Sequence, residues 1–314
     1  MPDPLAQVVA LLRPGAPSSK LVEASAPWAV RRAEMGQPFY FAVLEGSCRL
    51  RIDGPDGADT VVLGEGDFLL IPSSRGFSAS SLDREPPGKA ARVHTPLSRT
   101  ARGARVGDPQ APVTLRMMVG NCELDARHAP VLLTLLPQWV HVRANRRLAV
   151  LVELVGDEAR ARRPARDVIT ARLLEVLLIE ALRSTDGGDR APGLAGGLAD
   201  PQLARSLRDM HERPAEPWTM ATLAASAALS RSAFFERFRR VVGMPPMQYL
   251  MSWRMALAEQ LLRETRLPIA DIAQRVGYSS VGTFGLAFKR HAGTPPGSYA
   301  RRHRRVAANA PSGR

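Results

Sequence analysis

The stretches LSRSAFFERFRRVVGMPPMQYL at 229–250 and SSVGTFGLAFKRHAGTPPGSYA at 279–300 are two copies of one pattern. Eight positions, among them two phenylalanines, a glycine, two prolines and a tyrosine, carry the same or a similar residue at a constant offset of 50. Upstream the offset is 49, because Leu-Ala at 223–224 returns as Ile-Ala at 272–273, so the second copy holds one extra residue in its turn. Matches at a fixed spacing indicate a duplicated supersecondary unit.

Each copy predicts a helix-turn-helix. In the first copy Thr219 and Ser230 are suitable N-caps for two successive helices, and Gly243 followed by proline would end the second helix. The second copy repeats this order, with Ser280 as the cap of its second helix. Between the copies, residues 245–265 predict a long connecting helix with apolar residues at helical spacing.

The positive charge is concentrated around this repeat. The chain carries 43 Lys and Arg against 30 Asp and Glu, a net charge of +13; residues 1–200 hold +2 of it and residues 201–314 hold +11. Such clustering favours a polyanionic partner, most often nucleic acid, over a merely solubilising surface. The sequence shows neither an apolar run long enough for a transmembrane helix nor a secretory signal, so we expect a cytoplasmic protein with no membrane partner.

The first part of the chain predicts strands followed by helices. Residues 39–54 alternate in a way that predicts a β-hairpin turning at Gly46, and residues 60–74 predict two further strands around a glycine-rich turn. Many short strands with such turns indicate a small barrel or sandwich. The remaining expected elements are a helix at 3–13, a strand pair at 113–125, and helices at 128–142 and 167–183.

Two resemblances follow from these motifs. Residues 205–305 are similar to the DNA-binding domain of AraC-family transcription regulators, most of all in GYSS at 277–280 and AFKR at 287–290. Residues 39–77 resemble the cupin barrel at the N-terminus of such regulators. The resemblance implies two helix-turn-helix units with both recognition helices in successive major grooves of double-stranded DNA. A connecting helix of about 18 residues spans roughly 27 Å, enough to space units about 34 Å apart.

The expected fold class is therefore α+β, a cupin-like β-barrel with helices followed by an all-α domain. The predicted parts are a sensor and dimerisation domain at 1–184, a linker at 185–204, a DNA-binding domain at 205–305 and a basic tail at 306–314. The helix at 167–183 is apolar over most of its circumference, which favours burial against a second subunit in a homodimer, with burial inside one chain as the alternative. Further expected partners are a small-molecule effector and, for an activator, RNA polymerase. We expect the protein to associate with the nucleoid.

The predicted DNA contacts lie on the two recognition helices. Arg231 suits guanine and Glu236 suits the amino group of cytosine, whereas basic residues near the helix ends suit phosphates. Leu286 stands where the family consensus has arginine, and glycines at 282 and 285 weaken the second helix, so that helix reads thymine methyls or only backbone. The first helix-turn-helix is therefore expected to carry most of the sequence discrimination. The full set is Ser230, Arg231, Ser232, Phe235, Glu236, Arg239, Arg240, Ser279, Ser280, Val281, Thr283, Lys289 and Arg290.

The barrel lacks the histidines of metal-binding cupins, because Phe39, Phe41 and Phe77 occupy the matching positions. No metal and no cofactor is therefore expected, and no catalytic residues are assigned. These phenylalanines, with Cys48 and Leu50, line either an apolar ligand pocket or a filled core. Three alternatives stay open: a cupin-type enzyme fused to a DNA-binding domain, a redox-sensing regulator that uses Cys48 and Cys122, and an architectural DNA binder without sequence preference.

Overall fold

The computed structural model describes residues 3–12, 15–34, 36–54, 57–86, 88, 95, 97–100, 103–123, 133, 135–161, 163–184 and 192–308. Two units are distinguished by their internal packing. The barrel unit draws on Leu12–Ala129 and Leu136–Ala195, and the helical unit on Met1–Leu11, Pro130–Leu135 and Gly196–Arg314. The predicted α+β class is confirmed. Within the described ranges no helix is long and apolar enough to cross a membrane.

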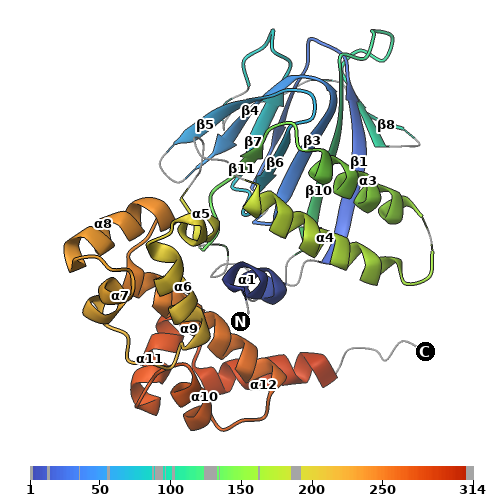
Figure 1. Cartoon of the computed structure of the whole chain (residues 1–314). Helices are drawn as coiled ribbons and strands as arrows, with labels where there is room; N and C mark the ends of the chain where they lie inside the picture. The colour runs from blue at the N-terminus through green and yellow to red at the C-terminus, as the bar shows by residue number, and fades with distance from the viewer. Residues whose placement is uncertain are drawn as a thin grey trace. The chain divides into compact units, whose positions relative to one another are not determined.

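The barrel unit is built from two sheets (Figure 1). All strand pairs are antiparallel except that of β1 with β9. The larger sheet has the order β11 (Val140–Val142), β6 (Phe68–Ile71), β3 (Phe39–Gly46), β10 (Leu115–Glu123), β1 (Gly15–Ala24), β9 (Gly103–Val106) and β8 (Leu97–Thr100). The smaller sheet has the order β2 (Ala29–Arg32), β7 (Phe77–Ser80), β4 (Cys48–Asp53) and β5 (Ala58–Leu63).

An apolar core joins the two sheets. Along β4 every second residue is buried, so Cys48, Leu50 and Ile52 enter the core while the residues between them stay half-exposed. Phe39 and Phe41 of β3 enter the same core from the larger sheet. The inward and outward faces therefore follow the period of two that the sequence shows.

The predicted hairpin at 39–54 is wrong. β3 pairs with β6 and β10, whereas β4 pairs with β5 and β7, so the chain passes from one sheet to the other at Gly46. Gly46 has φ 81°, and a Cβ there would lie 2.1 Å from the carbonyl oxygen of Thr114. Crossing between sheets lets the apolar faces of both strands bury against each other. The two strands expected at 60–74, β5 and β6, also lie in different sheets.

Two helices contact the larger sheet, α3 (Arg146–Arg160) and α4 (Arg166–Arg183), which lie against β1 (Figure 1). The helix predicted at 167–183 is thus confirmed as α4, and α3 was not predicted. The strand pair expected at 113–125 is the single strand β10. Of the helix expected at 128–142, residues 128–132 and 134 lie outside the described part of the chain. The prediction is wrong for 135–142, where the chain runs through a turn into β11, which pairs with β6, because the proline at 137 does not continue a helix.

The helical unit holds both predicted helix-turn-helix units. The domain boundaries stay a prediction. The N-terminal helix expected at 3–13 is confirmed as α1, and it packs with this unit. A short helix, α5, lies inside the predicted linker. The helices are α1 (Pro4–Leu12), α5 (Leu194–Ala199), α6 (Leu203–Glu212), α7 (Met220–Ser226), α8 (Arg231–Val242), α9 (Pro246–Glu264), α10 (Ile269–Arg275), α11 (Val281–Ala292) and α12 (Pro296–Ala308).

The turns of the two copies are built alike. Ala228 (φ 54°) and Gly277 (φ 82°) both take left-handed conformations, 49 positions apart. The next residue in each copy donates its N–H to Ala224 or Ala273, at 3.0 and 2.9 Å. The N-caps of the following helices are 50 positions apart, so the extra residue of the second copy is Ser279.

A buried histidine ties three helices of the helical unit together. The Nδ1–H of His211 in α6 donates to Oε1 of Gln7 in α1 at 3.0 Å, and Nε2 accepts from the hydroxyl of Tyr249 in α9 at 2.7 Å. The imidazole also stacks on Trp253, with ring centroids 4.1 Å apart. Burial lowers the pKa of His211 to about 3.

Replacing Ala228 by glycine is expected to raise the free energy of unfolding by about 1 kcal/mol, because glycine takes a positive φ without steric cost. Gly277→Ala should lower it by about 1–3 kcal/mol, since the new Cβ would also lie 2.8 Å from the carbonyl oxygen of Pro214. Urea denaturation measures both changes. Ala225→Gly, inside α7, is the matched control and should destabilise the protein. Equal signs for Ala228→Gly and Ala225→Gly would contradict this explanation.

Acid is expected to weaken the helical unit through His211. Its pKa lies below the ordinary 6.5, so the unfolded chain binds a proton first and stability is lost as pH falls below 6.5. Between pH 7.5 and pH 5 the free energy of unfolding should fall by about 2 kcal/mol from this group. His211→Gln keeps an acceptor for Tyr249 but does not titrate, so urea denaturation of this variant should lack that part of the loss. The same pH dependence in both proteins would argue against it.

Candidate nucleic-acid interface

Helices α8 and α11 start and end in the same way. The Ser230 hydroxyl accepts from the N–H of Ala233 at 3.2 Å, and the Ser280 hydroxyl accepts from the N–H of Thr283 at 3.4 Å. Each helix ends at a glycine with positive φ, 89° at Gly243 and 71° at 293. The order of buried, half-buried and exposed residues is identical along 231–240 and 281–290. The two helices therefore present corresponding residues to solvent.

An aromatic cluster fixes the inner face of each helix. In the first copy the ring centroids of Phe234 and Phe238 are 5.5 Å apart, and Tyr249 of α9 lies 5.7 Å from Phe238. The second copy repeats this arrangement at 284, 288 and 299, with spacings of 5.7 and 5.3 Å. The four phenylalanines are fully buried. Val242 is buried on the same inner face of α8, while Val241 is half-exposed.

The outer face of α8 carries the predicted contact residues. Ser230, Ser232 and four charged residues are exposed, and Phe235 is half-buried. Within the described part of the chain, none of these four charged side chains forms an ion pair: Arg231, Glu236, Arg239 and Arg240. By contrast, Arg237 forms an ion pair with Asp200, with Nε 2.9 Å from Oδ2, so it is not one of the charged side chains available to nucleic acid.

The outer face of α11 is chemically different. The predicted residues Ser279, Ser280, Val281, Thr283, Lys289 and Arg290 are all exposed. Sequence reasoning left Leu286 out of the candidate set, although its side chain is 71% exposed. In the repeat, Leu286 corresponds to Glu236 at the offset of 50. This correspondence is the sequence signal that identifies Leu286 as a candidate contact residue.

The predicted pocket residues of the barrel unit pack against one another. The ring centroids of Phe39, Phe41 and Phe77 are 4.8–5.0 Å apart, and Cys48 and Leu50 are fully buried in the same core. This cluster fills the core where the sequence allowed either a pocket or packed side chains. Among the described residues no group of His, Cys, Asp and Glu could hold a metal ion.

The cysteines do not form a described pair. Burial, with a smaller contribution from the charge of Asp67, raises the pKa of the Cys48 thiol to about 12, so this thiol stays protonated and unreactive near neutral pH. The side chain of Cys122 lies outside the described residues. The redox alternative therefore has no support from Cys48.

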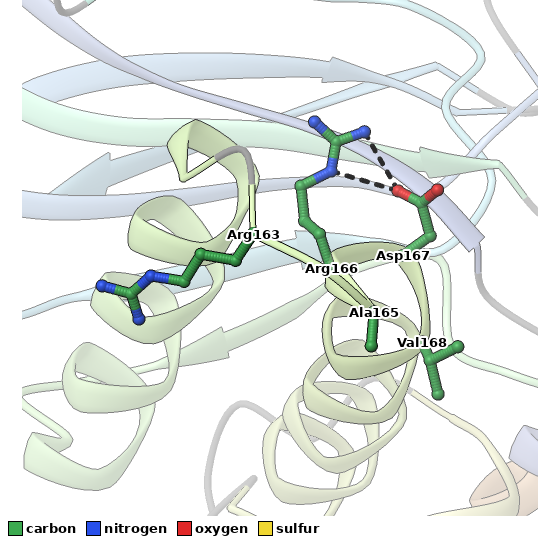
Figure 2. Close-up of a pocket in the computed structure, with 5 residues that line it drawn as sticks. All are labelled: Arg163, Ala165, Arg166, Asp167 and Val168. Carbon is green, nitrogen blue, oxygen red and sulfur yellow. Dashed lines mark hydrogen bonds and ion pairs between the residues drawn. The ribbon is translucent and has the colours of Figure 1, made fainter.

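A surface pocket of about 380 Å³ lies where α3 turns into α4 (Figure 2). Its lining includes Arg163 and Arg166, and the Arg166 guanidinium donates twice to Oδ1 of Asp167 at 3.0 and 3.1 Å. None of the predicted pocket residues lines it. The carboxylate described in its lining, that of Asp167, is paired with Arg166.

Comparison with known proteins gives matches in both units. The family model described as Cupin matches residues 3–185, and the model described as Helix-turn-helix domain matches residues 223–302. A Streptomyces lividans protein named as an AraC-like transcription regulator is 35% identical over 313 residues, which covers 96% of this chain and 98% of that protein. The HTH-type transcriptional regulator AlkR of Acinetobacter baylyi is 29% identical, over 88% of this chain and 92% of that protein. The DNA-binding domain of AdpA, solved in complex with a target DNA, is 29% identical over 36% of this chain and 100% of that chain, with a TM-score of 0.34.

Proposed function

The chain belongs to the AraC family of DNA-binding transcription regulators, and from this premise we propose that α8 and α11 enter successive major grooves on one face of double-stranded DNA. The observation that carries the proposal is the identical exposure pattern of the two helices, set by the same inner aromatic cluster. α9 connects them with 19 residues, a length of about 28 Å, which suits two grooves about 34 Å apart.

Sequence discrimination is assigned mainly to α8. Arg231 and Glu236 are exposed and form no ion pair with a described residue, so both are available to base edges. Arginine pairs with guanine, and glutamate accepts from the amino group of cytosine. Arg240, Lys289 and Arg290 stand near the helix ends and suit phosphates, which supply salt-dependent affinity and register.

The barrel unit is proposed to sense a signal, through a small-molecule effector, and not to catalyse a reaction. Its inner face is a packed apolar cluster, and its relatives are named as regulators. RNA polymerase is the expected further partner if the protein activates genes. With a DNA partner, the protein is proposed to associate with the nucleoid, in the cytoplasm.

A homodimer through α3 and α4 is the proposed assembly. Val150 and Leu154 stand one turn apart on α3 and are 47% and 46% exposed. On α4, Val168 is 65% exposed, with Ile169 and Val176 at 44% and 46%. The other side of α4 is buried, so the helix is apolar on two sides, as the sequence predicted, and its outer side is free for a second copy. A symmetric dimer would present paired DNA-binding units.

Arg231→Ala is expected to weaken binding to a specific operator by about 1–3 kcal/mol and to relax base preference in one half-element. Thr283→Ala should change base preference less. Lys289→Ala is the matched control for a phosphate contact and should weaken all sequences alike, with a salt slope smaller by about 1. Footprinting and titration on duplexes with single base changes measure these effects. Equal loss of selectivity for Arg231→Ala and Thr283→Ala would disprove the assignment to α8.

Leu154→Glu and Val176→Glu are each expected to shift the protein from dimer to monomer, because each would bury a carboxylate in the proposed interface. Sedimentation equilibrium measures the association constant. Val62→Glu on β5 is the matched control, since Val62 is 50% exposed and lies in the other sheet, and it should leave association unchanged. A wild-type monomer at micromolar concentration would contradict the dimer.

A further inference from the structure

The outer faces of the two recognition helices, α8 and α11, carry different side chains at corresponding positions. At an offset of 50, Arg231 is matched by Val281 and Glu236 by Leu286. The apolar replacements are exposed, Val281 to 48% and Leu286 to 71%. Charged groups on one outer face are thus replaced by hydrocarbon on the other, while the inner faces stay the same.

Two glycines widen this difference. Gly282 and Gly285 lie within α11, where each costs about threefold to fivefold in helix stability relative to alanine. The fold does not require them: a Cβ at Gly285 would meet nothing within 4 Å, and a Cβ at Gly282 would meet only the Ser280 hydroxyl, at 3.6 Å. Glycine in open space at such a cost is typical of a backbone that must approach another molecule closely.

We infer that α11 recognises thymine methyl groups through Leu286 and Val281, with the glycines letting the helix backbone approach the base edges. The inference rests on the proposed function and gives α11 a base preference. The C5-methyl of thymine is the apolar group that a major groove displays, and apolar side chains are its usual contacts. Leucine and valine side chains have no hydrogen-bonding group with which to select guanine or cytosine.

The operator is therefore asymmetric. The half-element under α8 contains G·C pairs read by charged side chains, and the half-element under α11 contains thymines read by hydrocarbon. The basic residues at the end of each helix, Arg239 and Arg240 or Lys289 and Arg290, are retained in both copies. Affinity for phosphate is thus common to both helices, and only base recognition differs.

The test uses a duplex selected from a random pool by the full-length chain. The half-element under α11 is the one whose base preference survives Arg231→Ala. Replacing its thymines by deoxyuridine removes only the methyl groups. Wild-type affinity should fall about fourfold for each contacted methyl, the value of one buried methylene-sized group. Leu286→Ala should bind the thymine duplex more weakly and should no longer respond to the methyl opposite residue 286. Deoxyuridine under α8, and the Glu236→Ala variant, serve as controls that leave the methyl effect under α11 unchanged.

Gly285→Ala separates a DNA role from a structural one. Alanine favours the helix and meets no atom, so the urea midpoint should rise while affinity for the selected duplex falls. Unchanged or higher affinity would overturn the role given to the glycines.

The remaining outcomes are also decisive. Specific binding that is insensitive to deoxyuridine, or that responds equally in wild type and Leu286→Ala, overturns the inference and leaves the proposed function standing. An α11 half-element without thymine does the same. Failure to select any specific duplex overturns the proposed function itself.

Discussion

Two phenylalanines and a tyrosine, placed identically in each copy, decide which side of each recognition helix meets solvent. The phenylalanines at 234, 238, 284 and 288 are fully buried. Because successive residues of a helix differ by about 100° in direction, turning α8 by one position would expose an aromatic ring and bury a charge. The free charges of α8 and the hydrocarbon of α11 are therefore consequences of packing on the opposite side.

The sequence predicted the helical unit well and the barrel unit less well, for a physical reason. Helix ends are determined by a few neighbouring residues, and the structure has its caps at Ser230, Ser280 and Gly243, as the sequence predicted. Strand alternation specifies which face is buried but not which strand is the partner, so β3 and β4 were paired wrongly although their inward residues were right. The exposure of the predicted contact residues on these helices could be read from the sequence, while their contact with DNA stays a proposal, and the exposed Leu286 was not among them. Leu286 departs from the family consensus, but its informative counterpart is Glu236, 50 positions earlier in this chain.

The missed helix α3 shows a different limit. Its buried residues Leu148, Val152 and Val155 recur at helical spacing after a capping Asn145, so the signal was present. A stretch of 15 residues with three arginines and exposed valine and leucine has less contrast between its faces than α6. The barrel interior was ambiguous for a different reason, because an apolar pocket and a packed core need the same residue types. Only the mutual contact of the three phenylalanine rings distinguishes them.

The hydrogen bond from His211 to Gln7 has a topological consequence. Both ends of the described chain belong to one unit, so the barrel unit is not a preceding module on a single tether. A fragment that begins after residue 11 would lack the Gln7 acceptor for a buried imidazole N–H. The chain passes between the two units at 11–12, 129–130, 135–136 and 195–196, so a signal sensed in the barrel unit has four covalent connections to the helical unit.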